Sequence, residues 1–391
     1  MDRMDDLCDW RPSTRGGVPP FVVMEVMAAA AAREAAGGDV LHLEVGQPMT
    51  AAPEGVRRAA AAALEQDRLG YTGACGTPRL RQRIAAHYGE VHDLDVDPAA
   101  VVVTTGASAG FVLALLAAFD VGDRVAMTYP GYAAYRNILQ GLGLEVVPIR
   151  VDASTRWVPS LAALDASGPL AGVVVASPSN PTGTTLTADE LAVLTTWCGD
   201  HHVRLIADEI YHGITAGLPA PTALSTSRSA VVVQSFSKYF SMTGWRLGWN
   251  VVPPDLRVAV ERLSQNLYIC PPVLSQAAAL AAFDCRDELE ANVRRYARNI
   301  EVLTTALRSC GLDQIAAADG AFYLWVDVSA ITDDAEALCR TWLAELGVAV
   351  TPGIDFDPEL GHRFVRFSVS ESTEVVALAG QRIAEWVTGR T

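Results

Sequence analysis

Between residues 101 and 252, short apolar runs rich in Val, Ile and Ala alternate with longer mixed segments. The runs predict seven strands, and their nearly continuous apolar character is typical of a sheet that helices cover on both faces. The segments Ser108–Phe119, Tyr132–Leu142 and Ala188–Cys198 predict helices between them. Strands that alternate with helices favour a mainly parallel α/β sheet. The predicted strands are Val101–Thr105, Arg124–Thr128, Leu144–Val147 (ended by Pro148), Gly172–Ala176, Val203–Ala207, Ala230–Gln234 and Leu247–Val252.

The chain on either side of this region predicts a second, smaller α/β domain. Residues 1–20 predict an irregular arm, and a helix from Phe21 to about Ala36 and a strand at Leu41–Val45 follow. Helices are also expected at Pro53–Gln66 and at Thr77–Tyr88, with Thr77 as N-cap. We expect a segment 1–45 that joins the small domain, a large domain 46–270 and a small domain 271–391. The C-terminal part predicts helices at about Pro254–Leu267, Pro272–Asp284, Arg286–Ser309, Ala335–Leu346 and Thr373–Val387, and strands at Phe322–Val328, Val348–Val350 and Phe364–Val369.

Composition narrows the classes of partner and site. Half of the 391 residues are apolar and 19% are charged, which is typical of a well-packed chain. The net charge of −15 argues against nucleic acids and anionic membranes as partners. The seven cysteines are scattered without a CxxC or Cys/His spacing, so we expect no metal site and a cytoplasmic location. No export or membrane segment is expected, because the apolar stretch Phe21–Ala32 is too short to span a bilayer.

The sequence contains 30 Lys and Arg residues, and only Lys238 is a lysine. The guanidinium of arginine stays protonated, whereas a buried lysine amine can lose its proton and attack a carbonyl group. The alternative is an arginine-rich composition with one leftover surface lysine. The lone lysine does not by itself decide between the two interpretations, so the neighbouring sequence must.

Polar or small residues follow five of the predicted strands, at the edge where ligands bind in open α/β sheets. Each has a simpler alternative: a tight turn, a packed aromatic ring, or an aspartate that caps a helix. Together they match one ligand, because pyridoxal 5′-phosphate carries a phosphate, an aldehyde, a ring nitrogen and a phenolic oxygen. Small residues before a helix suit the phosphate, and an acid suits the ring nitrogen. The residues are Gly106 to Gly110, Tyr132, Asn180, the pair Asp208 and Tyr211, and Ser235, Lys238 and Arg246.

Three motifs within this set carry a family resemblance: SPSNPTG at Ser177–Gly183, DEIY at Asp208–Tyr211 and SFSKYFSMTGWRLG at Ser235–Gly248. From about Pro20 to near its C-terminus the chain resembles the class I/II pyridoxal-phosphate-dependent aminotransferases of the aspartate aminotransferase superfamily (fold type I). The resemblance implies a large domain with a mainly parallel seven-stranded sheet. It also implies a smaller α/β domain formed by the N-terminal segment and the C-terminal third.

The resemblance assigns a role to each matching residue. Lys238 would form the internal aldimine and move the proton between substrate and cofactor, and Asp208 would keep the pyridine nitrogen protonated. Tyr211 and Asn180 would hydrogen-bond the ring oxygen, and Tyr132 would stack on the ring. The phosphate would be bound by Gly106, Ala107, Ser108, Ser235, Ser237 and Arg246.

Three further residues extend this assignment. Tyr71 matches a tyrosine that reaches the phosphate of the neighbouring subunit, which implies a homodimer with shared sites. Arg366 matches the arginine that grips the substrate carboxylate, with the backbone of Gly46 beside it; the alternative is a surface arginine on a strand. A bidentate guanidinium suits that carboxylate better than an ammonium does.

The resemblance therefore implies transamination between an L-amino acid and a 2-oxo acid by a ping-pong mechanism. A lyase, a cyclising synthase or a decarboxylase on the same scaffold stays open as an alternative. A pyridoxal-phosphate-binding regulator without turnover and a Schiff-base lysine enzyme without a cofactor are further alternatives. Known regulators that resemble this fold carry an added DNA-binding domain, which is not expected here because only about 20 residues precede the first predicted helix and the chain is acidic. A lysine enzyme without a cofactor leaves the acid–phenol pair and the phosphate loop unexplained.

Overall fold

A computed structural model describes residues 12–390 of the chain. Its largest element is a seven-stranded sheet with the order β2-β8-β7-β6-β5-β3-β4. All neighbouring strands are parallel except β8, which runs antiparallel to both β2 and β7. The predicted mainly parallel seven-stranded sheet is therefore confirmed. The strands are β2 (Val101–Thr104), β3 (Arg124–Tyr129), β4 (Glu145–Arg150), β5 (Gly172–Ala176), β6 (Arg204–Asp208), β7 (Val231–Ser235) and β8 (Gly248–Val251).

Helices cover both faces of this sheet, as the apolar strands require. On one face, α4 (Gly106–Ala118), α5 (Ala133–Gly141) and α8 (Arg257–Leu267) enclose one buried core. The other face packs against a second core, most of whose helical residues come from five further helices. They are α2 (Glu54–Gln66), α3 (Pro78–His92), α6 (Leu161–Ala166), α7 (Ala188–Asp200) and α9 (Val273–Ala279).

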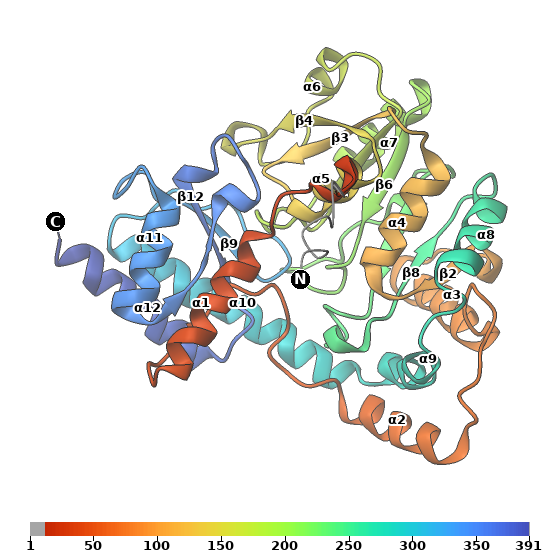
Figure 1. The fold of residues 1–391 in the computed structure, drawn as a ribbon, viewed down its shortest axis with the longest axis horizontal. Helices are drawn as coiled ribbons and strands as arrows, with labels where there is room; N and C mark the ends of the chain where they lie inside the picture. Colours follow the sequence, from red (N-terminus) through yellow and green to blue (C-terminus); the bar gives the residue numbers. More distant parts are fainter. Residues whose placement is uncertain (1–11, 391) are drawn as a thin grey trace, which may run out of the picture.

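The C-terminal third forms the smaller domain together with the N-terminal segment (Figure 1). Its antiparallel sheet has the order β11-β12-β9, with β9 (Tyr323–Asp327), β11 (Thr351–Pro352) and β12 (Phe364–Ser368). The N-terminal strand β1 (Leu41–His42) pairs in parallel with β10 (Val348–Ala349), which ties the N-terminal segment to the small domain. The surrounding helices are α1 (Val22–Ala35), α10 (Arg286–Ser309), α11 (Ala335–Thr341) and α12 (Thr373–Thr388). The domain boundaries expected after residues 45 and 270 stay a prediction.

Three local features differ from the expected elements. Pro148 does not end its strand but lies inside β4, because β4 is an edge strand and one side of it needs no ladder donor. The short helix α6 was not predicted from the pattern. The expected helix Ala335–Leu346 divides into α11 and a π-helical turn at Trp342–Leu346. The expected N-cap of α3 is confirmed, since the Thr77 side chain accepts a hydrogen bond from the N–H of Leu80.

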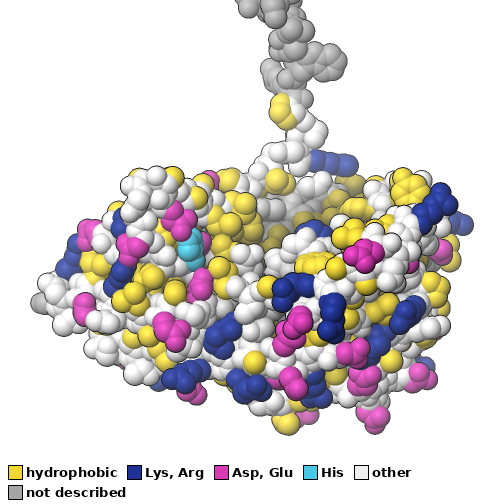
Figure 2. Space-filling view, turned by 90° about the horizontal axis from the view of Figure 1, so that it is seen from below, with side chains coloured by type: hydrophobic (Ala, Val, Ile, Leu, Met, Phe, Trp, Pro, Cys, Tyr) yellow, Lys and Arg dark blue, Asp and Glu magenta, His cyan; other side chains and the backbone are white. Residues whose placement is uncertain are grey.

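The surface of the molecule carries both acidic and basic side chains. Figure 2 shows acidic and basic side chains interspersed over one face of the molecule, between scattered apolar ones. Within residues 12–390, no helix combines the length and the apolar character needed to cross a membrane.

Candidate active site

A cavity of about 220 Å³ opens at the carboxyl ends of the central strands, between the large sheet and the small domain. Most of the residues that the sequence singled out lie on its wall, although they come from widely separated parts of the chain. The wall includes Gly46, Ala107, Ser108, Tyr132, Asn180, Asp208, Tyr211, Ser237, Lys238, Arg246 and Arg366. Convergence at this edge follows from the parallel strand order, which turns successive βα loops to the same side.

Lys238 occupies the centre of this arrangement, on the loop that follows β7. Its Nζ donates a hydrogen bond to the carbonyl oxygen of Gly46, and it lies 5.7 Å from the ring centroid of Tyr211. Burial, together with the nearby guanidinium groups of Arg366 and Arg246, lowers the pKa of Lys238 to about 8, against the opposing effect of Asp208. A lysine in this setting loses its proton much more readily than a surface lysine.

Asp208 lies at the end of β6 and is only 2% exposed. Its Oδ2 accepts a hydrogen bond from the phenol of Tyr135, and its Oδ1 accepts one from the N–H of Ile210 at 3.1 Å. Burial raises the pKa of Asp208 to about 6, and these two donors oppose that shift. A carboxylate so enclosed is stabilised by a cation, and the cavity beside it has room for one.

Arg366 and Tyr211 belong to a buried polar network on the small-domain side. Nη1 of Arg366 donates to Oδ1 of Asn180 at 3.1 Å, and Nη2 donates to the carbonyl oxygen of Glu44. The Tyr211 and Tyr323 hydroxyls lie 2.7 Å apart. Arg366 is 3% exposed, so the alternative of a surface arginine is excluded. Its Nε is buried without a hydrogen-bond partner among the described residues, which leaves one donor for a ligand.

The opposite end of the cavity presents donors that suit an anion. Helix α4 begins at Gly106, and its N-terminal residues Ala107 and Ser108 line the wall. Gly106 has φ +74°, a left-handed conformation that favours glycine, and a Cβ there would lie 2.5 Å from Nη2 of Arg246. Ser237 lies on the wall, and its hydroxyl is 2.7 Å from that of Ser235. Ser235 is buried behind it rather than on the wall.

Tyr71 lies apart from the other predicted site residues. Its side chain is 85% exposed and it is not on the cavity wall of its own chain. A large aromatic side chain so exposed is unusual in a chain that buries most of its rings. Its predicted contact with a neighbouring subunit stays a prediction.

Several wall residues were not found from the sequence. Tyr135 stands three residues after Tyr132, one turn along α5, and that i, i+3 spacing was the available signal. Tyr323 and Glu44, which are not on the wall but contact the wall residues Tyr211 and Arg366, also carried no local signal. The apolar wall of Phe21, Val23, Met24, Met27 and Val45 also went unnoticed, because helix α1 reaches the site only through tertiary packing.

Asp355 fixes the start of that helix over the cavity. Its carboxylate accepts hydrogen bonds from the N–H groups of Val22 at 3.2 Å and Val23 at 3.4 Å. The ring of Phe21 packs edge-on against Tyr132, with centroids 5.7 Å apart. The first turn of α1 is thereby joined to both domains.

The donor set fits pyridoxal 5′-phosphate. The N-terminus of α4 and Arg246 suit its phosphate, the enclosed carboxylate of Asp208 suits a protonated ring nitrogen, and Lys238 suits its aldehyde. The free Nε of Arg366 suits a substrate carboxylate at the other end.

Comparison with known proteins places this geometry in a family. The family model described as aminotransferase class I and II matches residues 38–383. The chain is 52% identical over 382 residues to a valine–pyruvate aminotransferase of Mycobacterium tuberculosis, covering 96% of this chain and 98% of that one. The crystal structure of an aminotransferase from M. tuberculosis superposes with a TM-score of 0.95 at 52% identity, covering 97% of this chain and 100% of that one. The aspartate aminotransferase of Thermus thermophilus with maleate gives a TM-score of 0.91 at 29% identity, covering 96% and 99%.

Proposed function

Because the chain belongs to the class I and II aminotransferases, we propose that it moves an amino group between an L-amino acid and a 2-oxo acid by a ping-pong mechanism with pyridoxal 5′-phosphate as cofactor. Aminotransferase activity itself follows from the family and from the close relatives. The observation that carries the finer proposal is the convergence of Lys238, Asp208 and Arg366 in one cavity.

Different residues of the cavity would hold different parts of the cofactor. When bound, pyridoxal phosphate supplies an electron sink for the charge that develops at the substrate α-carbon. Ala107, Ser108, Ser237 and Arg246 would hold the phosphate, and Tyr132 would pack on the ring. Asn180 and Tyr211 would hydrogen-bond the ring oxygen, and Asp208 would hold the proton on the ring nitrogen.

Lys238 would attach the cofactor between turnovers and act as the general base. A base works best with a pKa near the working pH, and burial brings the pKa of Lys238 to about 8. The carbonyl of Gly46 accepts a hydrogen bond from its Nζ and orients it. Arginine at this position would stay protonated and could not serve.

Arg366 would orient the substrate through its α-carboxylate. Its guanidinium is held from one side by Asn180 and by the backbone of Glu44, which leaves Nε for the ligand. The rings of Tyr323 and Phe356 lie 4.6 and 4.8 Å from its Cζ, so the planar group is fixed before substrate binds. An arginine fixed in this way would help to hold the α-proton near Lys238.

The wall formed by α1 indicates the class of side chain that the substrate carries. Phe21, Val23, Met24 and Met27 give an apolar surface. The described residues on the wall include three cations, and each already has a role: Lys238, Arg246 and Arg366. A second substrate carboxylate would meet apolar groups and lose its hydration. We therefore propose amino donors with apolar side chains, in agreement with the relative named valine–pyruvate aminotransferase.

We also propose a homodimer in the cytoplasm. The exposed Tyr71 supports a site completed by a second chain. The cysteines of residues 12–390 are free, which supports a reducing compartment. No nucleic acid or membrane partner is expected of a chain with net charge −15.

A two-part assay tests this function. Purified protein incubated with pyridoxal phosphate and then freed of unbound cofactor should show a visible absorption band, and L-valine with pyruvate should yield alanine and the oxo acid of valine. Omitting pyruvate should stop turnover after one equivalent. Continued release of ammonia or of a 2-oxo acid without an acceptor would instead identify a lyase, and the absence of any absorption band would exclude the cofactor.

A further inference from the structure

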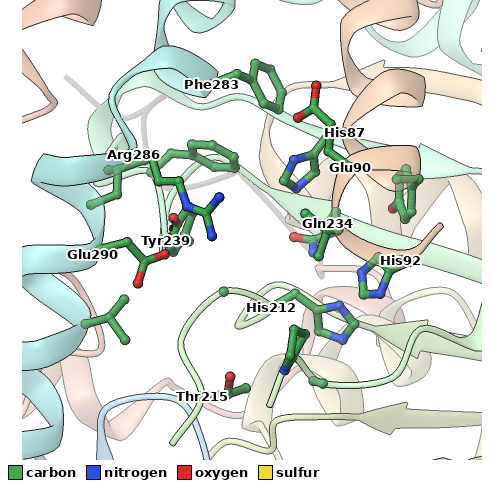
Figure 3. A pocket seen from close by; sticks show the side chains of 18 of the residues that line it. His87, Glu90, His92, His212, Thr215, Gln234, Tyr239, Phe283, Arg286 and Glu290 are labelled. Atoms are coloured by element: carbon green, nitrogen blue, oxygen red, sulfur yellow. Dashed lines mark hydrogen bonds between the residues drawn. The ribbon is translucent and has the colours of Figure 1, made fainter. Parts of the chain in front are cut away.

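A second cavity of about 440 Å³ lies between α3, the loop after Tyr211 and the start of α10 (Figure 3). It shares no wall residue with the candidate active site. Its volume falls in the range of about 300–1,000 Å³ that is typical of small-molecule sites. The proposed reaction assigns it no role.

One side of this cavity is built from rings. The His87 ring centroid lies 5.3 Å from that of Phe283 and 6.1 Å from that of Phe240, and Tyr88 and Trp249 also line the wall. Aromatic walls of this kind bury a planar apolar ring favourably. The shape and lining therefore suit a ligand with one aromatic ring.

The imidazoles on the wall contribute hydrogen-bonding groups rather than charge. Burial lowers the pKa of His87 to about 4 and that of His212 to about 3, and it also lowers the pKa of His92. These rings are neutral near pH 7. The described residues contain no group of three or more His, Cys, Asp or Glu that could hold a metal ion. A metal therefore does not explain the three histidines.

Opposite charges stand one turn apart on the facing wall. Figure 3 shows Arg286 and Glu290 extending from α10 beside the cavity, with Gln234 and the histidines across from them. The guanidinium of Arg286 makes no hydrogen bond or ion pair with another side chain in the described part of the chain. Glu290 uses Oε1 to accept a hydrogen bond from the Tyr239 phenol at 2.8 Å, which leaves Oε2 available. An unpaired guanidinium beside a half-used carboxylate complements a zwitterion.

We propose that this cavity binds a free aromatic α-amino acid, with its carboxylate on Arg286, its ammonium on Glu290 and its ring against His87, Phe240 and Phe283. The site is separate from the one that would bind the amino donor. Its occupant would contact Gln234 and Tyr239, which flank Ser235 and Lys238 in the chain. The ligand would therefore lie against the segment that carries the proposed base.

Binding of L-phenylalanine, measured by saturation-transfer NMR, tests the proposal on the full chain. We expect Arg286→Ala to weaken binding at least about 10-fold, because a charge-assisted pair is lost. Arg294→Ala, an exposed arginine of α10 away from the cavity, should bind as the wild type does. Arg366→Ala should retain this binding, because that variant affects only the donor site.

Ligand analogues test separately whether Arg286 binds the carboxylate and Glu290 binds the ammonium group. Glu290→Gln keeps an acceptor for Tyr239, so it should weaken binding of L-phenylalanine while leaving that of 3-phenylpropanoate, which has no ammonium group, unchanged. Arg286→Ala should weaken both ligands. Absence of saturable binding, binding that Arg286→Ala leaves intact, or binding that Arg366→Ala abolishes would each overturn the proposal.

Discussion

The Tyr135 phenol donates a hydrogen bond to Oδ2 of Asp208, joining the first turn of α5 to the end of β6. Burial and the neighbouring carboxylate raise the pKa of Tyr135 well above its ordinary value, so the phenol keeps its proton and stays a donor. The same bond favours the ionised form of Asp208 against the effect of burial. Tyr135 is thus placed to keep the acid charged where a protonated ring nitrogen needs it.

Removing the Tyr135 hydroxyl should destabilise the ionised form of Asp208 while leaving the carboxyl group in place. Tyr135→Phe is expected to lower kcat about 10-fold, because a hydrogen bond to a charged group contributes about 1.5–3 kcal/mol. Asp208→Asn should lower kcat more, by about 10²-fold or more, because the amide cannot hold the proton on the ring. Steady-state kinetics measures both. Tyr129→Phe, a buried tyrosine of β3 outside the cavity, is the matched control and should retain activity. Equal losses in Tyr129→Phe and Tyr135→Phe would show a packing effect instead.

The lowered pKa of Lys238 can be measured without any cofactor, because no other lysine is present. Acylation of the cofactor-free protein, followed by peptide mass spectrometry of Lys238, should rise with pH to a midpoint near 8. Only the neutral amine reacts, so the curve reports its deprotonation. An ordinary midpoint, above pH 10, would contradict the effect of burial and of the neighbouring cations.

The contribution of Arg366 to that shift can be separated. A positive charge nearby disfavours the ammonium form, so Arg366→Ala should move the acylation midpoint of Lys238 to higher pH. Arg363→Ala changes a half-exposed arginine that pairs with Asp327 at the start of β12, and should leave the midpoint unchanged.

Glu209 should make the stability of the fold depend on pH. It is 2% exposed, and burial raises its pKa to about 8 from an ordinary 4.5, although the Ala223 N–H and the Thr222 hydroxyl donate to it. Between these two pH values the folded chain holds the proton and the unfolded chain loses it. The free energy of unfolding therefore falls as pH rises through this window, by at most about 1.4 kcal/mol per pH unit.

Glu209→Gln should remove this dependence, because the amide stays neutral and can still accept both hydrogen bonds. The Tm of Glu209→Gln minus that of the wild type should become more positive as pH rises from 5.5 to 8. Glu145→Gln, an exposed partner of Arg124, should show no such trend. A constant difference in Tm between Glu209→Gln and the wild type would mean that Glu209 is ionised throughout.

The strand ends were predictable because each chemistry-bearing group follows an apolar run directly in the sequence. Lys238 follows β7 and Asp208 ends β6, so local patterning placed both at one edge of the sheet. Pro148 was misjudged because edge position depends on strand order, which no local pattern contains. Tyr323 and the α1 wall escaped detection for a similar reason, since Tyr323 contacts Tyr211 and α1 lines the cavity only when the small domain packs on the large one.

The apolar wall of α1 should set the preference among amino donors. Met27→Ala removes a side chain from the wall, and kcat/KM for L-valine should fall about 10-fold, as expected for lost apolar contact in a pocket. L-Alanine, whose side chain is shorter, should be affected less. Met49→Ala changes a methionine that is 43% exposed and outside this cavity, and should leave both donors unchanged. An equal fall for valine and alanine would place Met27 away from the substrate side chain.

Tyr71 should act in the site of the other subunit. Tyr71→Ala and Lys238→Ala are each expected to be nearly inactive as pure proteins, the first through weak binding of the cofactor phosphate and the second through loss of the base. In a mixed dimer, one site would receive both defects and the other site neither. Refolding the two variants together at equal amounts should therefore restore about a quarter of the wild-type activity, since half of the dimers would be mixed and each would have one intact site. If Tyr71 acted within its own chain, both sites of every mixed dimer would be defective and mixing would restore nothing.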